Sequence, residues 1–249
     1  MKKLVVGNWK MNPASWKEAR RIIDSIRSKS KRFKNVTTVL CPPSPYLGLS
    51  LLCNISFGAQ DIFYESEGAY TGGISAKMIK SFGINYVIVG HSERRALGDT
   101  DEIINKKIKL ILGEKMFPIL CVGENTRDHH SHYLHFVREQ IHSALKGVSK
   151  NLIGKIIIAY EPVWAIGKNA SGVLDGEEAL HMNIFIRKVI SDIAGESVAK
   201  KIKILYGGSV DVKNSTQFIS IGKMDGLLVG RESLIPKNFL QIIENTNRA

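Results

Sequence analysis

The sequence predicts an α/β protein built as a single (β/α)8 parallel barrel over residues 1–249. Short apolar runs recur along the chain with segments of helical periodicity between them, an alternation typical of βαβ units and parallel sheets. Eight such repeats in 249 residues match the size of a (β/α)8 barrel. No Gly/Ser-rich linker or change of composition divides the chain, so we expect one domain.

The expected strands are short apolar runs at residues 4–6, 36–40, 55–59, 86–90, 118–122, 156–160, 203–206 and 226–229. Helical spacing covers residues 14–31, 75–82, 100–114, 132–145, 177–194 and 214–221, with a short helix expected at 46–52 and a closing one at 236–243. Residues 60–73 contain turn formers and aromatic side chains but no helical pattern. Structureless loops of that length are usually functional, and exposed aromatic side chains favour a partner surface. The alternative is that this loop packs back on its own subunit.

The composition is that of an ordinary globular protein, with 44% hydrophobic and 23% charged residues. We expect no membrane span, because no apolar run is long enough, and no signal peptide, because the N-terminal apolar stretch is too short. The three cysteines, Cys41, Cys53 and Cys121, are too few and too scattered for a disulfide framework or a zinc site. These features together predict a cytoplasmic protein.

The net charge of +12 comes from 35 Lys and Arg against 23 Asp and Glu. A solvated basic face on the helices explains it best, because the basic residues fall mostly in helical stretches without interleaved exposed aromatics. Attraction of a small phosphorylated anion is a second explanation, and nucleic-acid binding is a distant third. We therefore expect no nucleic-acid partner.

Glu161 directly follows an apolar run, at the strand end where parallel α/β folds place their chemistry. Pro162 restrains the backbone of the acid. The apolar residues that follow suit a lid that closes over a base and excludes water, or else a loop packed on the core. The proposed lid consists of Pro162, Val163, Trp164, Ala165, Ile166 and Gly167.

Two further strand ends carry polar side chains. Asn8 and Lys10 follow the first strand, and alternation along an extended segment points both to one side. Lys10 could meet a phosphate or an oxyanion, or be a plain solvent lysine. His91 follows the fourth strand and could be a general acid, a metal ligand or a core histidine; a short helix opening after it would favour a neutral imidazole. Glu93 could pair with Lys10.

Glycine-containing turns follow the last two predicted strands, at residues 206–209 and 229–232. Barrels often form a phosphate site there from backbone N–H groups. Three histidines, His129, His132 and His135, recur every three residues, but no carboxylate or cysteine pattern supports a metal site, and a solvated helix start is the better explanation. We expect no metal.

Assembled in order, these blocks resemble the triosephosphate isomerase family over essentially the whole chain. The matching blocks are residues 7–12, 86–95, 160–167 and 206–210, with weaker matches at 58–61 and 68–72. The resemblance implies a (β/α)8 (TIM) barrel that interconverts dihydroxyacetone phosphate and glyceraldehyde 3-phosphate in glycolysis and gluconeogenesis, without a cofactor.

The resemblance also implies roles for single residues. Glu161 matches the base that moves a proton between adjacent carbons, and His91 the neutral electrophile, a division of labour known for enzymes of this family. Asn8 and Lys10 match residues that bind substrate and stabilise the enediolate, and Glu93 a supporting carboxylate. The resemblance further implies phosphate contacts through backbone amides at Gly167, Ser209, Gly230 and Arg231, and a homodimer loop with Thr71 at its tip.

Three departures from the family pattern stand out. Arg231 replaces the usual second glycine, although it still offers its backbone N–H. Residues 168–172 differ from the usual second half of the lid, and residues 128–135 lack the usual acidic pattern. Two other functions compete: a different phosphate-binding barrel enzyme, motivated by the late glycine turns, and a basic nucleic-acid binder, motivated by the charge. The complete set Asn8, Lys10, His91 and Glu161 favours the isomerase.

Overall fold

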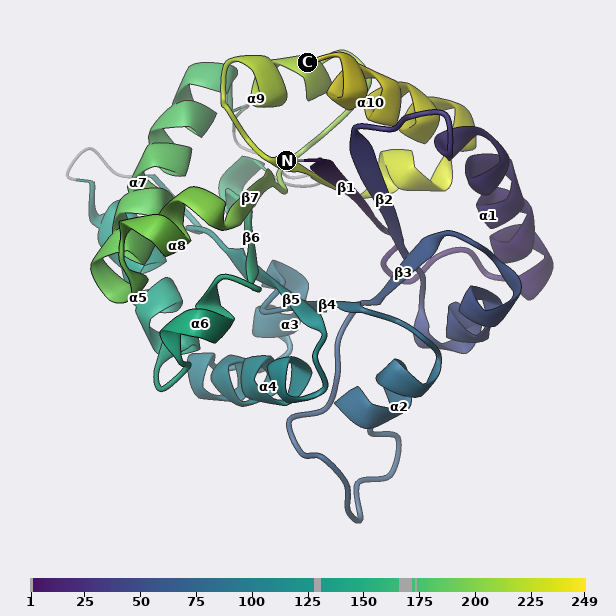
Figure 1. The fold of residues 1–249 in the computed structure, drawn as a ribbon, viewed down its shortest axis with the longest axis horizontal. Helices are drawn as coiled ribbons and strands as arrows, with labels where there is room; N and C mark the ends of the chain where they lie inside the picture. Colours follow the sequence, from purple (N-terminus) through teal and green to yellow (C-terminus); the bar gives the residue numbers. More distant parts are fainter. Residues whose placement is uncertain (1, 128–130, 166–171, 173) are drawn as a thin grey trace.

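A computed structural model describes residues 2–127, 131–165, 172 and 174–249. Within them, eight parallel strands close into a barrel in sequence order, with the last strand paired to the first (Figure 1). The predicted fold class is confirmed. The strands are β1 (Lys3–Asn8), β2 (Val36–Cys41), β3 (Ser56–Ala59), β4 (Tyr86–Val89), β5 (Phe117–Val122), β6 (Ile157–Tyr160), β7 (Lys203–Tyr206) and β8 (Gly226–Val229).

Helices surround the barrel (Figure 1). The α-helices are α1 (Trp16–Ser30), α2 (Ala76–Ser81), α3 (Ser92–Ala96), α4 (Asp101–Gly113), α5 (His132–Leu145), α6 (Lys150–Ile153), α7 (Gly176–Ala194), α8 (Glu196–Lys201), α9 (Ser215–Ser220) and α10 (Pro236–Arg248). Three 3-10 helices are η1 (Ser44–Leu52), η2 (Val163–Ala165) and η3 (Arg231–Leu234). The segment predicted as a short helix at 46–52 is thus a 3-10 helix that begins earlier, and the closing helix runs beyond residue 243 to Arg248.

The barrel is packed on both faces of its sheet. Alternate strand residues point inward and fill the interior with an apolar cluster of Leu4, Val6, Val39, Cys41, Ile88, Ile119, Cys121, Ile157, Ala159, Leu205 and Leu228. The residues between them pack against the helices as part of a second, larger core. Because both faces are buried, the strands are continuous apolar runs, which is why the sequence revealed them.

Barrel closure between β8 and β1 requires a glycine. A Cβ atom on Gly226 would lie 1.8 Å from the backbone oxygen of Leu4, so no larger residue fits at this register.

Side-chain caps mark the start of α1, α4 and α7. Ser15 accepts a hydrogen bond from the backbone N–H of Glu18, and Thr100 accepts one from that of Ile103. Asp175 forms a full capping box with Glu178 at the start of α7. None of the helices among the described residues combines the length and apolar character that a membrane span requires.

Candidate active site

Most of the predicted site residues line one cavity of about 450 Å³ at the carboxyl ends of the strands. Because all strands are parallel, the residues that follow them meet at this end of the barrel. The predicted residues that line the cavity are Asn8, Lys10, His91, Glu161, Ser209, Gly230 and Arg231. Gly167 and Ile166 lie outside the described residues.

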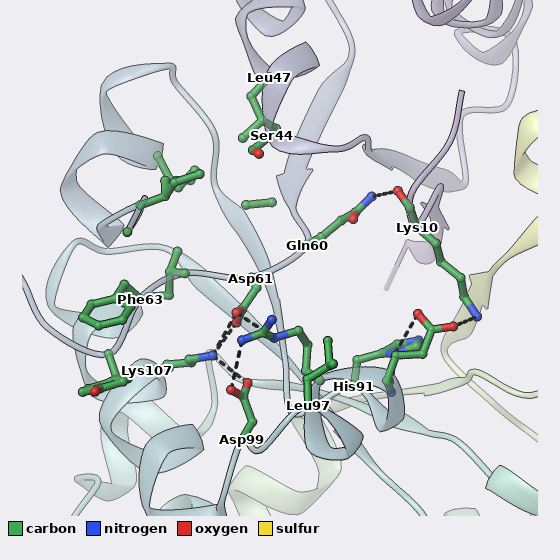
Figure 2. A pocket seen from close by; sticks show the side chains of 18 of the residues that line it. Lys10, Ser44, Leu47, Gln60, Asp61, Phe63, His91, Leu97, Asp99 and Lys107 are labelled. Carbon is green, nitrogen blue, oxygen red and sulfur yellow. Dashed lines mark hydrogen bonds and ion pairs between the residues drawn. The ribbon is translucent and has the colours of Figure 1, made fainter. Parts of the chain in front are cut away.

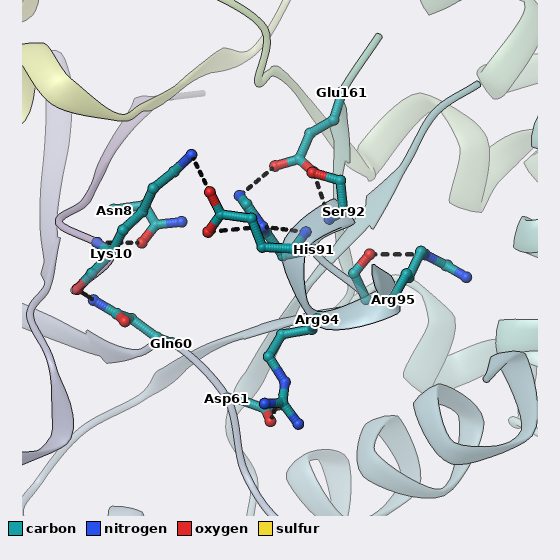
Figure 3. A network of polar contacts seen from close by, with 11 residues as sticks. Asn8, Lys10, Gln60, Asp61, His91, Ser92, Arg94, Arg95 and Glu161 are labelled. Atoms are coloured by element: carbon teal, nitrogen blue, oxygen red, sulfur yellow. Dashed lines mark hydrogen bonds and ion pairs between the residues drawn. The ribbon is translucent and has the colours of Figure 1, made fainter. Parts of the chain in front are cut away.

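Glu161 and His91 lie next to each other in the lining of this cavity (Figure 3). Oε1 of Glu161 lies 3.4 Å from Nε2 of His91, and Oε2 accepts a 3.4 Å hydrogen bond from the backbone N–H of Ser92. Glu161 is only 2% exposed and its backbone N–H donates to Val122 on β5 at 2.8 Å. The carboxylate is therefore held at the strand end, out of bulk water.

Helix α3 orients the imidazole of His91. Its Nδ1 accepts a hydrogen bond of 3.2 Å from the backbone N–H of Glu93, so His91 is the N-cap of this helix. An atom that accepts a hydrogen bond from an N–H carries no proton itself, which assigns the proton of the neutral ring to Nε2. Nε2 is the nitrogen that faces Glu161, so the ring presents an N–H donor to the cavity.

Lys10 stands at the opposite wall of the site (Figure 3). Its Nζ lies 2.8 Å from Oε1 of Glu93, the pair that the sequence suggested. Its backbone is in the left-handed region with φ of 51°, which costs a non-glycine residue about 1–2 kcal/mol. Two contacts hold this conformation: Lys10 N–H donates to Asn8 Oδ1 at 3.1 Å, and Gln60 Nε2 donates to the Lys10 carbonyl at 2.9 Å.

The glycine turn after β7 leaves room for the carboxylate. A Cβ atom on Gly207 would lie 2.9 Å from Cγ of Glu161. Ser209, two residues further along the same turn, donates its hydroxyl to the carbonyl of Ala165 at 2.8 Å, which ties this turn to the proposed lid. The absence of a side chain at Gly207 therefore leaves the space that the carboxylate of Glu161 occupies.

A buried acid at the end of β5 anchors the start of the proposed lid. Glu124, 1% exposed, accepts hydrogen bonds of 2.8 Å from Trp164 Nε1 and from the hydroxyl of Tyr160, and one of 3.1 Å from Arg127 Nε. Burial and the charge of Glu124 raise the pKa of Tyr160 well above its usual value, so the phenol stays a donor. Pro162 and Ala165 are buried, while Val163 and Trp164 are half-buried.

Sequence reasoning missed Glu124, Gln60 and Ser92 as supports of the site. Glu124 follows an apolar strand just as Glu161 does, so the same signal could have found it. Cys121 is fully buried beside Glu161. Burial and then the charge of Glu161 raise the pKa of this thiol well above its usual value.

The metal hypothesis for the three histidines stays untested, because His129 lies outside the described residues. Across the described part of the chain, no three or more His, Cys, Asp or Glu side chains lie close enough together to hold a metal ion.

A second cavity of about 460 Å³ adjoins the first through Asn8, Lys10 and His91, which line both (Figure 2). Buried charges form part of its wall: Lys107, 1% exposed, donates to Asp61 at 2.8 and 2.9 Å and to Asp99 at 2.6 Å. Arg94 adds contacts to both carboxylates, at 3.0 Å to Asp61 and 3.1 Å to Asp99.

The connection at residues 60–73 has no helix or strand and protrudes from the barrel between β3 and α2 (Figure 1). Phe63 stacks on Tyr64, with ring centroids 4.3 Å apart, and lies 4.7 Å from the ring of Tyr70. The alternative that the loop packs on its own subunit explains Phe63 and Tyr64, which are half-buried. Tyr70 is still 45% exposed and Thr71 beside it is exposed.

The fold and the site define a class of protein: a (β/α)8 barrel with a buried carboxylate, an imidazole N–H and a lysine around one cavity. A sequence model of triosephosphate isomerase matches residues 3–246. The chain is 40% identical to the triosephosphate isomerase of Dictyoglomus turgidum and 42% identical to that of Dictyoglomus thermophilum, each over 98% of this chain and 99% of the relative. It is 38% identical to that of Natranaerobius thermophilus, over 98% of this chain and 96% of the relative. The chain belongs to the triosephosphate isomerase family.

Proposed function

We propose that the protein interconverts dihydroxyacetone phosphate and D-glyceraldehyde 3-phosphate by proton transfer through an enediolate. The observation that carries the proposal is that Glu161 and His91 face the same cavity, with Oε1 and Nε2 3.4 Å apart. Glu161 is the base that removes a proton from the carbon next to the carbonyl and returns it to the neighbouring carbon. His91 donates its Nε2–H to the carbonyl oxygen, where negative charge develops, and takes up the proton of the neighbouring hydroxyl, so that the proton on oxygen moves as the one on carbon does.

Lys10 and Asn8 stabilise the same charge from the other side of the cavity. Lys10 Nζ is a compact cation in a partly water-excluded site, and its pair with Glu93 keeps it in place. Glu93 thus acts as a positioning residue through Lys10. This arrangement of a base, a hydrogen-bond donor and a cation supports an aldose–ketose isomerisation, which needs no more than proton transfer and charge stabilisation.

The phosphate of the substrate is bound at the turns after β7 and β8. Ser209, Gly230 and Arg231 line the cavity there and would offer backbone N–H groups. Gly167 would add a further amide from the lid, with residues 162–167 closing over the substrate. Phosphate binding is remote from the reacting carbons, so its free energy can orient the substrate and favour closure.

We also propose that the protein is a homodimer in which the loop at residues 60–73 reaches a second copy. Met11 is 94% exposed and Leu97 75% exposed, and both line the cavity that adjoins the active site. Large apolar side chains so exposed favour burial against a partner. The exposed tip of the loop at Thr71 would enter this cavity of the second copy.

Sedimentation velocity tests the dimer, with Thr71→Arg as the disruptive variant and Thr216→Arg on α9 as the control. We expect a dimer for the parent and the control, and monomer for Thr71→Arg. A monomeric parent protein would contradict the dimer.

We propose further that residues 1–249 act as one domain and that the protein works in the cytoplasm. The closed barrel supports the first point, and a single cooperative unfolding transition would test it. The three cysteines are unpaired and buried, which supports a reducing compartment. Cell fractionation would test the location.

A coupled assay with glyceraldehyde 3-phosphate and no added cofactor tests the proposed activity. We expect turnover by the purified protein, competitive inhibition by phosphoglycolate, and loss of most turnover in Glu161→Ala with an unchanged circular dichroism spectrum. An inactive parent protein that is folded would refute the activity, and full activity in Glu161→Ala would refute the base.

A further inference from the structure

Arg231 differs from the other basic residue at the active-site cavity. Within the described residues, Lys10 and Arg231 are the lysine or arginine side chains that line it. Lys10 is paired with Glu93 at 2.8 Å. Among the described residues, the guanidinium of Arg231 has no hydrogen bond and no carboxylate within 4.0 Å. Its charge is therefore available to an anion in the cavity.

The neighbouring acid does not neutralise this charge. Oε2 of Glu232 accepts a 2.7 Å hydrogen bond from Asn238 Nδ2 at the start of α10. The backbone of this turn is also fixed, because Ser233 donates its N–H and its hydroxyl to the Gly230 carbonyl at 2.9 and 2.6 Å. Arg231 thus has an anchored main chain and an exposed side chain.

The cavity near Arg231 suits an anion, and its other full positive charge, on Lys10, is already paired with Glu93. Gly207, Gly208 and Gly230 line this region, and residues without side chains let an anion approach the backbone. A phosphate monoester carries nearly two negative charges at neutral pH. An arginine fork can bind two phosphate oxygens at once, and it adds a full charge that backbone amides lack.

We propose that the guanidinium of Arg231 binds the phosphate of the substrate and determines the preference for phosphorylated over unphosphorylated trioses. This inference rests on the proposed function, which assigns the same region to the phosphate through backbone N–H groups alone. Arg231 is then a binding residue through its side chain, in addition to its main chain.

The test uses Arg231→Ala, Arg231→Gln and Arg231→Lys, with Arg21→Ala as a matched loss of charge. Arg21 is an exposed residue of α1 that does not line the cavity. Calorimetry measures the Kd of inorganic phosphate, and kinetics measures kcat and KM for glyceraldehyde 3-phosphate and for glyceraldehyde. We expect Arg231→Ala and Arg231→Gln to raise the Kd of phosphate and the KM for glyceraldehyde 3-phosphate about tenfold. The preference for glyceraldehyde 3-phosphate over glyceraldehyde should fall by the same factor. Arg231→Lys should give Kd and KM values between those of the parent and of Arg231→Ala, and Arg21→Ala should have the same values as the parent.

An unchanged phosphate Kd in Arg231→Ala would overturn the inference. So would a fall in kcat alone, with Kd and KM unchanged, because that pattern indicates a structural effect. Arg231→Gln keeps most of the side-chain length, so its phosphate Kd decides the matter if the Ala variant does not fold. If the parent protein binds phosphate through Arg231 but does not isomerise the triose, the proposed function fails, and the part of this inference that concerns phosphate binding stands.

Discussion

Nε2 of His91 lies 3.4 Å from Oε1 of Glu161, and the two side chains are only 8% and 3% exposed. They follow β4 and β6, two strands that are separated by β5 in the barrel. A base and a hydrogen-bond donor that act on adjacent atoms of a small substrate need this proximity. The proposed reaction depends on this pair.

Replacing His91 by Gln should separate polarisation of the carbonyl from binding of the substrate. We expect kcat to fall about 10²-fold, because a preorganised donor to the developing oxyanion is lost, while KM changes little. Steady-state kinetics on the triose phosphate measures both values. A kcat equal to that of the parent would contradict the role given to His91.

Replacing Gly207 by Ala should displace the base without touching its chemistry. The added Cβ would lie 2.9 Å from Cγ of Glu161 and 3.4 Å from the carbonyl of Tyr160, so the carboxylate must move. Small misplacements of a catalytic group cost about 10²-fold in rate, and we expect a loss of that order in kcat. Gly48→Ala is the control, since nothing lies within 4 Å of its Cβ. Equal activity of the two variants would show that Gly207 is not needed for room.

Replacing Lys107 by Met should destabilise the fold. Lys107 is 1% exposed, and its loss would leave the carboxylates of Asp61 and Asp99 without their shared ammonium group. We expect the free energy of unfolding in denaturant to fall by about 3–5 kcal/mol. The matched control is Lys106→Met, because the Lys106 side chain is 57% exposed and should cost less than about 1 kcal/mol. A similar loss of unfolding free energy in Lys107→Met and Lys106→Met would refute the stabilising role of the contacts between Lys107 and the carboxylates of Asp61 and Asp99.

The buried phenol of Tyr206 should make the folded protein less stable at alkaline pH. Burial raises the pKa of its phenol above the usual 10.0, and its ring stacks on Phe218 with centroids 3.7 Å apart. Above pH 10 the unfolded chain loses this proton first, so the native state binds more protons and its stability falls as pH rises. We expect the free energy of unfolding of Tyr206→Phe to fall less steeply above pH 10, by up to about 1.4 kcal/mol per pH unit. Parallel curves for the parent and the variant would contradict this.

The strands could be predicted because a strand buried on both faces is an unbroken apolar run. Ile157–Tyr160 is a good example: every residue of it is buried. The short helices α6 and α8 were missed, because four and six residues are too few to establish a helical period. The segment Ser44–Leu52 was expected as an ordinary short helix from residue 46, and local periodicity does not distinguish the 3-10 form.

At the site, the order of the motifs predicted which residues meet, but not what holds them. Lys107 falls within the helix expected at residues 100–114, but its contacts with Asp61 and Asp99 could not be predicted, because only the folded barrel brings these residues together. The hydrogen bond from Glu93 N–H to His91 Nδ1 depends on the start of α3, which the sequence indicated only in outline. Contacts of this kind follow from tertiary structure and leave no local signal.

Glu161→Gln in deuterated water is the most direct test of the central claim that this carboxylate moves the proton. The parent protein should introduce solvent deuterium at the carbons next to the carbonyl of the triose phosphate, as followed by NMR. Glu161→Gln should slow both this incorporation and isomerisation about 10³-fold, while inorganic phosphate still binds as in the parent. Parent-like deuterium incorporation in a folded Glu161→Gln variant would contradict the account.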